Sequence, residues 1–205
     1  FAELRRESAR AIASLGFDGY GIGGLSLGEP KAVTWDMLEA TTAHLPPDKP
    51  RHLLGVGSPE DILEGVALGV DIFDSALPTR VARNGALFSR NHRYNIANSG
   101  FRELDAPVEL DCDCYTCATF SAAYLHHMFR CQELLAYRLA TIHNLRFIVR
   151  LMQDIRRAIM DGSFAQMKET FLQRYQPADA EIAATQKQKW LEAQRRKHSS
   201  PDVEG

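Results

Sequence analysis

The chain has 205 residues, of which 45% are hydrophobic and 24% are charged, and its formal net charge is -2. This composition is typical of a globular protein with a substantial core. The nearly neutral net charge argues against a protein whose whole surface binds polyanions. It still allows a local basic patch. The sequence has no apolar run of 18 residues and no signal peptide at its charged start, so we expect no membrane partner. Cysteines that are clustered, without the even and dispersed spacing of a disulfide framework, indicate a reducing, cytoplasmic compartment.

The first 73 residues alternate between predicted helices and strands. The run Ser58-Pro59-Glu60-Asp61 is a helix start signal, because it combines a capping serine, a proline suited to the first helical position and an acidic first turn. Helices are expected over 3–15, 31–45 and 59–68, and strands over 17–22, 52–57 and 70–73. Helices and strands that alternate across short connections predict parallel strands with crossover helices.

This alternation favours an α/β fold, namely the C-terminal portion of a TIM (β/α)8 barrel. The polar residues and glycines at the strand ends suit the loops that build active sites in such barrels. The alternative is an open, doubly wound sheet. A barrel needs about eight strands, so we expect the missing strands before Phe1. The chain also begins inside a predicted helix without an initiator Met, and we expect it to be part of a longer protein.

From Pro78 to about Leu110 the sequence predicts a long irregular stretch, and ordered loops of this length are usually functional. Just after it, Cys112, Cys114 and Cys117 lie within six positions. Such clustered thiols favour a Zn²⁺ ion or an iron–sulfur cluster, and a chance group of buried or redox-active thiols is the alternative. A tetrahedral zinc site needs a fourth ligand. Local chemistry leaves that ligand open among Cys131, His126, His127 and His143.

Beyond the cysteines, helices are expected over 121–129, 132–160 and 164–175, the long one with apolar residues at three- and four-residue spacing. The polar residues that follow are expected to form a frayed helix or a disordered tail. We divide the chain into three parts. They are the last βα units of the barrel (1–90), a zinc-binding subdomain with the C-terminal helices (91–176), and the polar tail (177–205).

Three groups of residues near the predicted strand ends could carry chemistry. Asp74 follows the strand 70–73, where a carboxylate could act as nucleophile, base or metal ligand, or simply cap a turn. The glycines of Gly21-Ile22-Gly23-Gly24 allow a ligand to approach the backbone closely, with a tight βα turn as the simpler alternative. Arg80 and Arg83 could bind phosphate or stack on bases, with solvated surface as the alternative.

Several separate motifs, in one order, resemble the bacterial tRNA-guanine transglycosylases, over about 4–175. The motifs are Gly23-Gly24-Leu25-Ser26-Leu27-Gly28-Glu29, Leu54-Gly55-Val56-Gly57-Ser58-Pro59, Asp71-Ile72-Phe73-Asp74-Ser75 with Leu77-Pro78-Thr79-Arg80, and the three cysteines followed by His143-Asn144. The resemblance implies a zinc-binding TIM barrel that exchanges guanine at wobble position 34 of the tRNAs for Asp, Asn, His and Tyr. The incoming base would be preQ1, in queuosine biosynthesis.

The resemblance also implies roles for single residues. Asp74 would attack the ribose C1′ and hold the RNA in a covalent intermediate, while Gly24 and Leu25 would contact the base. The tRNA anticodon loop would meet two segments, Gly55-Val56-Gly57-Ser58-Pro59-Glu60-Asp61 and Thr79-Arg80-Val81-Ala82-Arg83. One structural zinc ion would be held by Cys112, Cys114, Cys117 and His143, since the 26 positions between the last two match the family's spacing.

Further expectations come from the same resemblance. The bulky Leu27 would leave no room for queuine and so favours preQ1, the C-terminal RNA-binding domains of archaeal members are not expected, and a homodimer is. The family's second catalytic Asp matches nothing in this chain, so we expect these 205 residues alone to be inactive. The competing hypotheses are a non-catalytic, zinc-stabilised tRNA-binding or partner subunit, and a zinc-stabilised structural module without a substrate.

Overall fold

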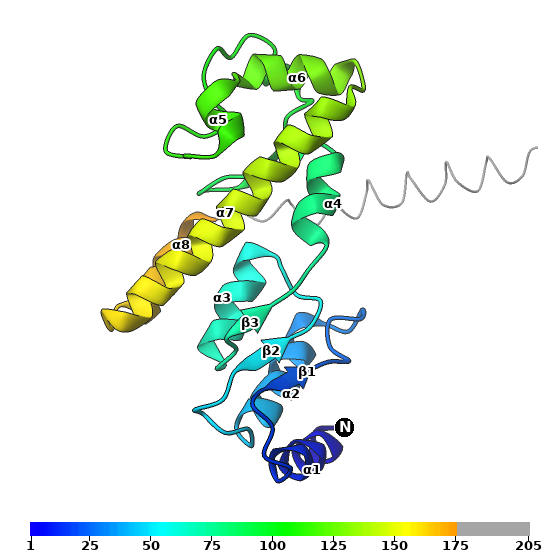
Figure 1. The fold of residues 1–205 in the computed structure, drawn as a ribbon, viewed down its shortest axis with the longest axis vertical. Helices are drawn as coiled ribbons and strands as arrows, with labels where there is room; N and C mark the ends of the chain where they lie inside the picture. The colour runs from blue at the N-terminus through cyan, green and yellow to red at the C-terminus, as the bar shows by residue number, and fades with distance from the viewer. Residues whose placement is uncertain (176–205) are drawn as a thin grey trace, which may run out of the picture.

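The computed structural model describes residues 1–175, so the predicted tail (177–205) lies outside the described part of the chain. Its first part is a three-stranded parallel sheet in the order β1-β2-β3, formed by Tyr20–Ile22, Arg51–Leu53 and Ile72–Phe73. Helices α1 (Ala2–Ala13), α2 (Lys31–Thr42) and α3 (Pro59–Ala67) precede the three strands in turn. The sheet and α1–α3 occupy one end of the elongated molecule (Figure 1).

The strands are shorter than the sequence predicted, and β2 shows the reason. The predicted strand 52–57 ends after Leu53, because the chain turns at Gly55, whose φ of +77° lies in the left-handed region that glycine tolerates. The start of α3, by contrast, is confirmed. The Ser58 hydroxyl accepts a hydrogen bond from the Asp61 amide at 3.3 Å, and Pro59 occupies the first turn.

The prediction of an irregular stretch over 78–110 is wrong as far as residue 101. This stretch contains helix α4 (Leu77–Arg83), the antiparallel hairpin of β4 (Ala86–Phe88) and β5 (Arg93–Asn95), and the short 3-10 helix η1 (Ser99–Phe101). These elements are too short to show a clear periodicity. They are stabilised instead by tertiary burial, which no local pattern reveals.

The second part of the molecule is organised around the long helix α7 (Leu134–Met160). Helices α5 (Tyr115–Thr119) and α6 (Ala122–Arg130) lie at the far end, and α8 (Phe164–Arg174) returns alongside α7 (Figure 1). The helices expected over 121–129, 132–160 and 164–175 are thus confirmed within two residues at each end. Among the residues that the structure describes, no helix is both long and apolar enough to cross a membrane.

Three clusters of buried side chains hold these parts together. One packs the sheet against α1 and α2, and a second packs α4, the hairpin, α6 and the first half of α7. The third joins Ile62 and Leu63 of α3 to Leu151 and Ile155 of α7. The α/β part and the helical part therefore share a core, so that α7 is joined to the sheet region by packed side chains.

Candidate active site and metal centre

Asp74 lies directly after β3 at the carboxyl end of the parallel sheet, with an exposed side chain. Its Oδ1 atom accepts a hydrogen bond from the Gly55 amide at 3.3 Å and lies 2.8 Å from Nε2 of His52 on β2. The carboxylate is thus held by the neighbouring strand and the turn that follows it. This is the edge at which parallel α/β structures place their reactive groups.

The loop after β1 presents the glycines. Arg5 of α1 donates hydrogen bonds to the carbonyl groups of Gly23 at 3.2 Å and Gly24 at 2.8 Å, and Gly24 has a φ of +66° that favours glycine. Gly24 is exposed, whereas the Leu25 side chain beside it is buried. The loop therefore exposes the backbone of Gly24 to a ligand, while the buried Leu25 side chain attaches the loop to the core.

Glu29 closes the same loop. Its carboxylate accepts hydrogen bonds from the Thr34 hydroxyl at 2.8 Å and the Leu27 amide at 2.8 Å, and also from the Ser26 amide. The Thr34 hydroxyl and these backbone amides lower the pKa of Glu29 to about 2. Because the ionised carboxylate fixes two successive amides, the loop has a defined shape, and the Leu27 side chain projects from it with 83% of its surface exposed.

The first predicted RNA-contacting segment, residues 55–61, lies beside Asp74. Gly57 packs closely against Ser75, the residue that follows Asp74. A methyl group added to Gly57 would lie 2.3 Å from Cβ of Ser75. Within the segment Gly55 is exposed, while Val56, Gly57 and Pro59 are buried. Ser58, Glu60 and Asp61 are half-buried, and both acids lie within 4 Å of Lys31 of α2, at 3.6 and 2.6 Å.

The second predicted segment, residues 79–83, is helical rather than an irregular loop. On α4 the side chains of Arg80 and Arg83 are exposed and, being three residues apart, lie on neighbouring positions of one helical surface. Thr79 and Val81 are half-buried, and Ala82 is fully buried in the core under α4. The structure thus leaves the two arginines, rather than the whole segment, available to a partner.

The structure brings Cys112, Cys114, Cys117 and His143 together. Their ligand atoms all lie within 4.8 Å of one another. Nδ1 of His143 is 3.7, 3.8 and 3.3 Å from the three sulfur atoms in chain order. A tetrahedral zinc ion with ordinary bond lengths would separate its sulfur and nitrogen ligands by about 3.6 Å. The four side chains therefore fit a metal site of the type expected from the sequence.

The histidine of this cluster is held in one orientation. His143 is fully buried on α7, and its Nε2 atom donates to the carbonyl of Phe88 on β4 at 2.8 Å. This bond leaves Nδ1 free to bind a metal, as outer hydrogen bonds of ligand histidines commonly do. Cys131 is exposed and pairs with His127 at 3.6 Å, and His126 bonds the carbonyl of Ile96, so these three rivals lie outside the cluster.

Hydrogen bonds among the three cysteine side chains shift the pKa values of their thiols. Hydrogen bonds from Cys112 and Cys117 lower the pKa of Cys114 to about 3, and a hydrogen bond from Cys117 helps to lower the pKa of Cys112. The pKa of Cys117 is raised well above its ordinary value, because it donates to its two neighbours and is buried. Three thiolates cannot share this small volume without a cation, so the arrangement suits a divalent ion.

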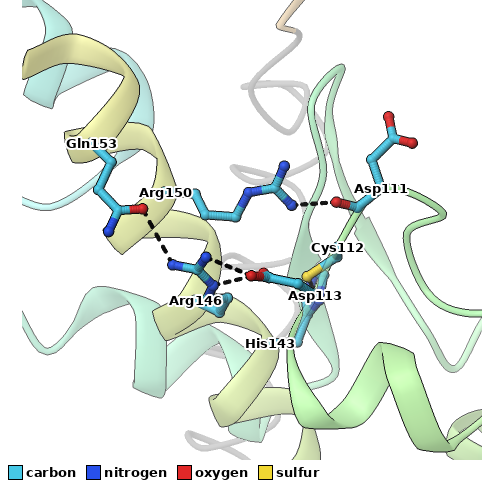
Figure 2. A network of polar contacts seen from close by, with 7 residues as sticks. All are labelled: Asp111, Cys112, Asp113, His143, Arg146, Arg150 and Gln153. Carbon is cyan, nitrogen blue, oxygen red and sulfur yellow. Dashed lines mark hydrogen bonds and ion pairs between the residues drawn. The ribbon is translucent and has the colours of Figure 1, made fainter. Parts of the chain in front are cut away.

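Two arginines of α7 clasp the loop that carries the cysteines. Figure 2 shows Arg146 bound through two nitrogens to the Asp113 carboxylate, at 2.7 Å each, and Arg150 bound to the Asp111 carbonyl. The Arg146 guanidinium lowers the pKa of Asp113. These residues were not predicted from the sequence, because the 33 positions between Arg146 and Asp113 leave no local signal.

Asn144 follows His143 directly in the sequence motif that resembles the family. It is fully buried, and its amide donates to the carbonyl groups of Pro78 and Ala86 at 3.0 Å each and accepts from the Phe88 amide at 3.0 Å. These three bonds tie α7 to the start of α4 and to β4. The helix that carries His143 therefore also holds the helix that carries Arg80.

Comparison with known proteins shows the family to which the chain is related. Residues 1–177 match the family described as Queuine tRNA-ribosyltransferase. A queuine tRNA-ribosyltransferase of Dehalococcoides mccartyi is 60% identical over 189 residues, which are 92% of this chain and 48% of the relative. Those of Herpetosiphon aurantiacus and Symbiobacterium thermophilum are 56% and 51% identical, over 85% and 88% of this chain and 45% of each relative.

The chain thus spans about half the length of the curated relatives that it matches. The match runs through the sheet, the Asp74 loop and the cysteine cluster alike, and it confirms the resemblance drawn from the sequence motifs. The chain belongs to the queuine tRNA-ribosyltransferase family.

Proposed function

We propose that this chain supplies the nucleophile and the metal-binding region of a tRNA-guanine transglycosylase. The enzyme would exchange guanine at wobble position 34 of the tRNAs for Asp, Asn, His and Tyr for preQ1, in queuosine biosynthesis. The observation that carries the proposal is the exposed carboxylate of Asp74, held by the Gly55 amide at the carboxyl end of a parallel sheet in a member of this family. We further propose that this sheet continues into a TIM barrel.

The exchange would proceed through two displacements. Asp74 attacks C1′ of the ribose, the bond from C1′ to N9 of guanine breaks, and the leaving base takes the electron pair. N9 of the incoming base, after losing its proton, then attacks C1′ and displaces the Asp74 carboxylate. Two inversions retain the configuration at C1′, and the covalent intermediate divides one difficult step into two easier ones. The acid and base that move the protons match no residue of this chain.

The residues around Asp74 would bind the substrates. The Gly24 backbone and the buried Leu25 would form one wall of the base pocket, about two strand spacings, or roughly 10 Å, from Asp74. Residues 55–61 and the exposed Arg80 and Arg83 would contact the anticodon loop, since arginine binds phosphate through two nitrogens and stacks on unpaired bases. A flipped-out nucleotide would then reach the carboxylate.

The cysteine cluster would hold one structural zinc ion. Cys112, Cys114, Cys117 and His143 provide four ligands, which complete a tetrahedral shell and leave no position for substrate. When bound, the ion compensates the charge of the thiolates and joins the cysteine loop to α7. We also propose that the protein acts in the cytoplasm as a homodimer.

The test is capture of the covalent intermediate by the full-length protein. Wild-type protein mixed with substrate tRNA should give an adduct that survives denaturing electrophoresis, and Asp74→Ala should abolish it. The exposed loop variant Asp48→Ala serves as the matched control and should keep the adduct. An adduct formed by Asp74→Ala would refute the proposal. Binding of tRNA by the wild type without any adduct would favour a non-catalytic tRNA-binding subunit instead.

A further inference from the structure

His52 is the one titratable side chain that contacts the Asp74 carboxylate among the described residues. It lies in the middle of β2, the central strand, and its Nε2 atom is 2.8 Å from Oδ1 of Asp74. His52 takes no part in the two displacements proposed for Asp74. The contact joins β2 to the residue that directly follows β3, 22 positions away in the sequence, so the pairing of β2 with β3 creates it.

We propose that His52 is a positioning residue for the nucleophile and that it selects which oxygen of Asp74 attacks. This inference rests on the proposed function of Asp74. His52 and the Gly55 amide, at 2.8 and 3.3 Å, both contact Oδ1, whereas Oδ2 has no hydrogen-bond partner within the described part of the chain. Two donors on one oxygen stop rotation of the carboxylate and leave Oδ2 as the atom that faces C1′.

The chemistry is consistent with donors on the oxygen that does not attack. When the bond between C1′ and Oδ2 forms, Oδ1 becomes the carbonyl oxygen of the ester and still accepts both hydrogen bonds. When the second base breaks the bond between C1′ and Oδ2, the electron pair returns to the carboxylate, and the same donors stabilise its charge. Nε2 must carry the hydrogen in each state, so His52 donates throughout and transfers no proton.

The surroundings of His52 make a purely structural role a poor explanation. The residue belongs to none of the three buried clusters, and its side chain keeps 35% of its surface exposed. Its partner across the β1–β2 pairing is Gly21, which has no side chain to pack against the ring. Replacement of His52 should therefore change the site much more than the stability of the fold.

The test uses two variants of the full-length protein. His52→Phe keeps a ring but removes the donor, and His52→Gln keeps an N–H group at a similar reach. We measure the single-turnover rate of adduct formation and the KM for tRNA. His52→Phe should slow adduct formation by roughly 10- to 100-fold with KM within about twofold, the loss expected of a misplaced reactive group, and His52→Gln should recover most of the rate.

A matched control is His44→Phe, because His44 follows α2 and contacts Arg10 of α1 rather than Asp74; it should keep the wild-type rate. Thermal unfolding of each variant shows whether the fold is intact. A wild-type rate in His52→Phe, equal losses in the Phe and Gln variants, or a raised KM with an unchanged rate would overturn the inference.

The parallel variant Asp74→Ala separates this inference from the proposed function. If Asp74→Ala still forms the adduct, Asp74 is not the nucleophile, and both the proposed function and the role of His52 are wrong. If Asp74→Ala abolishes the adduct while His52→Phe leaves the rate unchanged, only the role of His52 is wrong.

Discussion

The edge of the sheet and the cysteine cluster hold their polar groups in opposite ways. At the edge, Asp74 is exposed and its observed contacts come from one backbone amide and one imidazole of a neighbouring strand. In the cluster, His143 is fully buried between the cysteine loop and β4. A nucleophile needs an accessible oxygen, whereas a structural metal site gains from complete enclosure. The two regions therefore should respond differently to substitution.

The largest effect should follow removal of one of the four proposed zinc ligands. Cys117→Ser should abolish zinc binding and lower the stability by at least about 3 kcal/mol, because metal binding and folding of such sites are coupled. For a domain of this size that corresponds to a fall in Tm of roughly 10 °C. Metal analysis and calorimetry of the purified protein check both.

The matched control for that variant is Cys131→Ser, since Cys131 is an exposed thiol outside the cluster. It should keep a full complement of zinc and the wild-type Tm. If Cys131→Ser removed the metal while His143→Ala retained it, the ligand assignment would be wrong.

A smaller effect on stability, with a direct effect on the site, is expected at the sheet edge. Gly57→Ala would place a methyl group 2.3 Å from Cβ of Ser75, so the loop that carries Asp74 must move. Overpacking of this kind costs about 1–3 kcal/mol, and displacement of Asp74, the proposed nucleophile, should slow adduct formation by about 100-fold. Zinc content should not change.

Gly100→Ala is the control for Gly57→Ala, because a methyl group at Gly100 would have no neighbour within 4 Å. Rapid-quench measurement of adduct formation compares the two. Wild-type kinetics in Gly57→Ala would show that the Ser75 loop adapts without moving the carboxylate.

The smallest effect should come from removing the ion pair between Arg146 and Asp113, which holds the cysteine loop against α7. Arg146 lowers the pKa of Asp113 below its ordinary 3.8, so the ionised carboxylate stabilises the fold above that pH. The contribution is lost as the pH falls through the lowered pKa. Asp113→Asn should therefore lower stability slightly at pH 7 and make no difference in strong acid, as measured by urea unfolding at several pH values.

Added salt provides a second test, since the ion pair between Arg146 and Asp113 is exposed and salt should screen it. The difference between wild type and Asp113→Asn should shrink in 1 M salt. A difference that persists in acid and in high salt would mean that the loop is held by packing instead.

Local chemistry in the sequence predicted the elements with strong signals of their own. The cap at Ser58, the apolar repeat of α7 and the crossover helices were found because each depends on residues within a few positions. Helix α4 and the β4–β5 hairpin were missed. They are short, and burial of Ala82, Leu87 and Phe88 against distant residues stabilises them.

The same division holds for the sites. The sequence by itself determined the spacing of the three cysteines, the carboxylate after β3 and, through its motifs, the family. Only the tertiary structure brought Nδ1 of His143 to the three sulfur atoms, Arg146 to Asp113 and His52 to Asp74. These contacts join residues 22 to 33 positions apart. The pairing of strands and the docking of α7 create them, and no pattern of neighbouring residues encodes such distances.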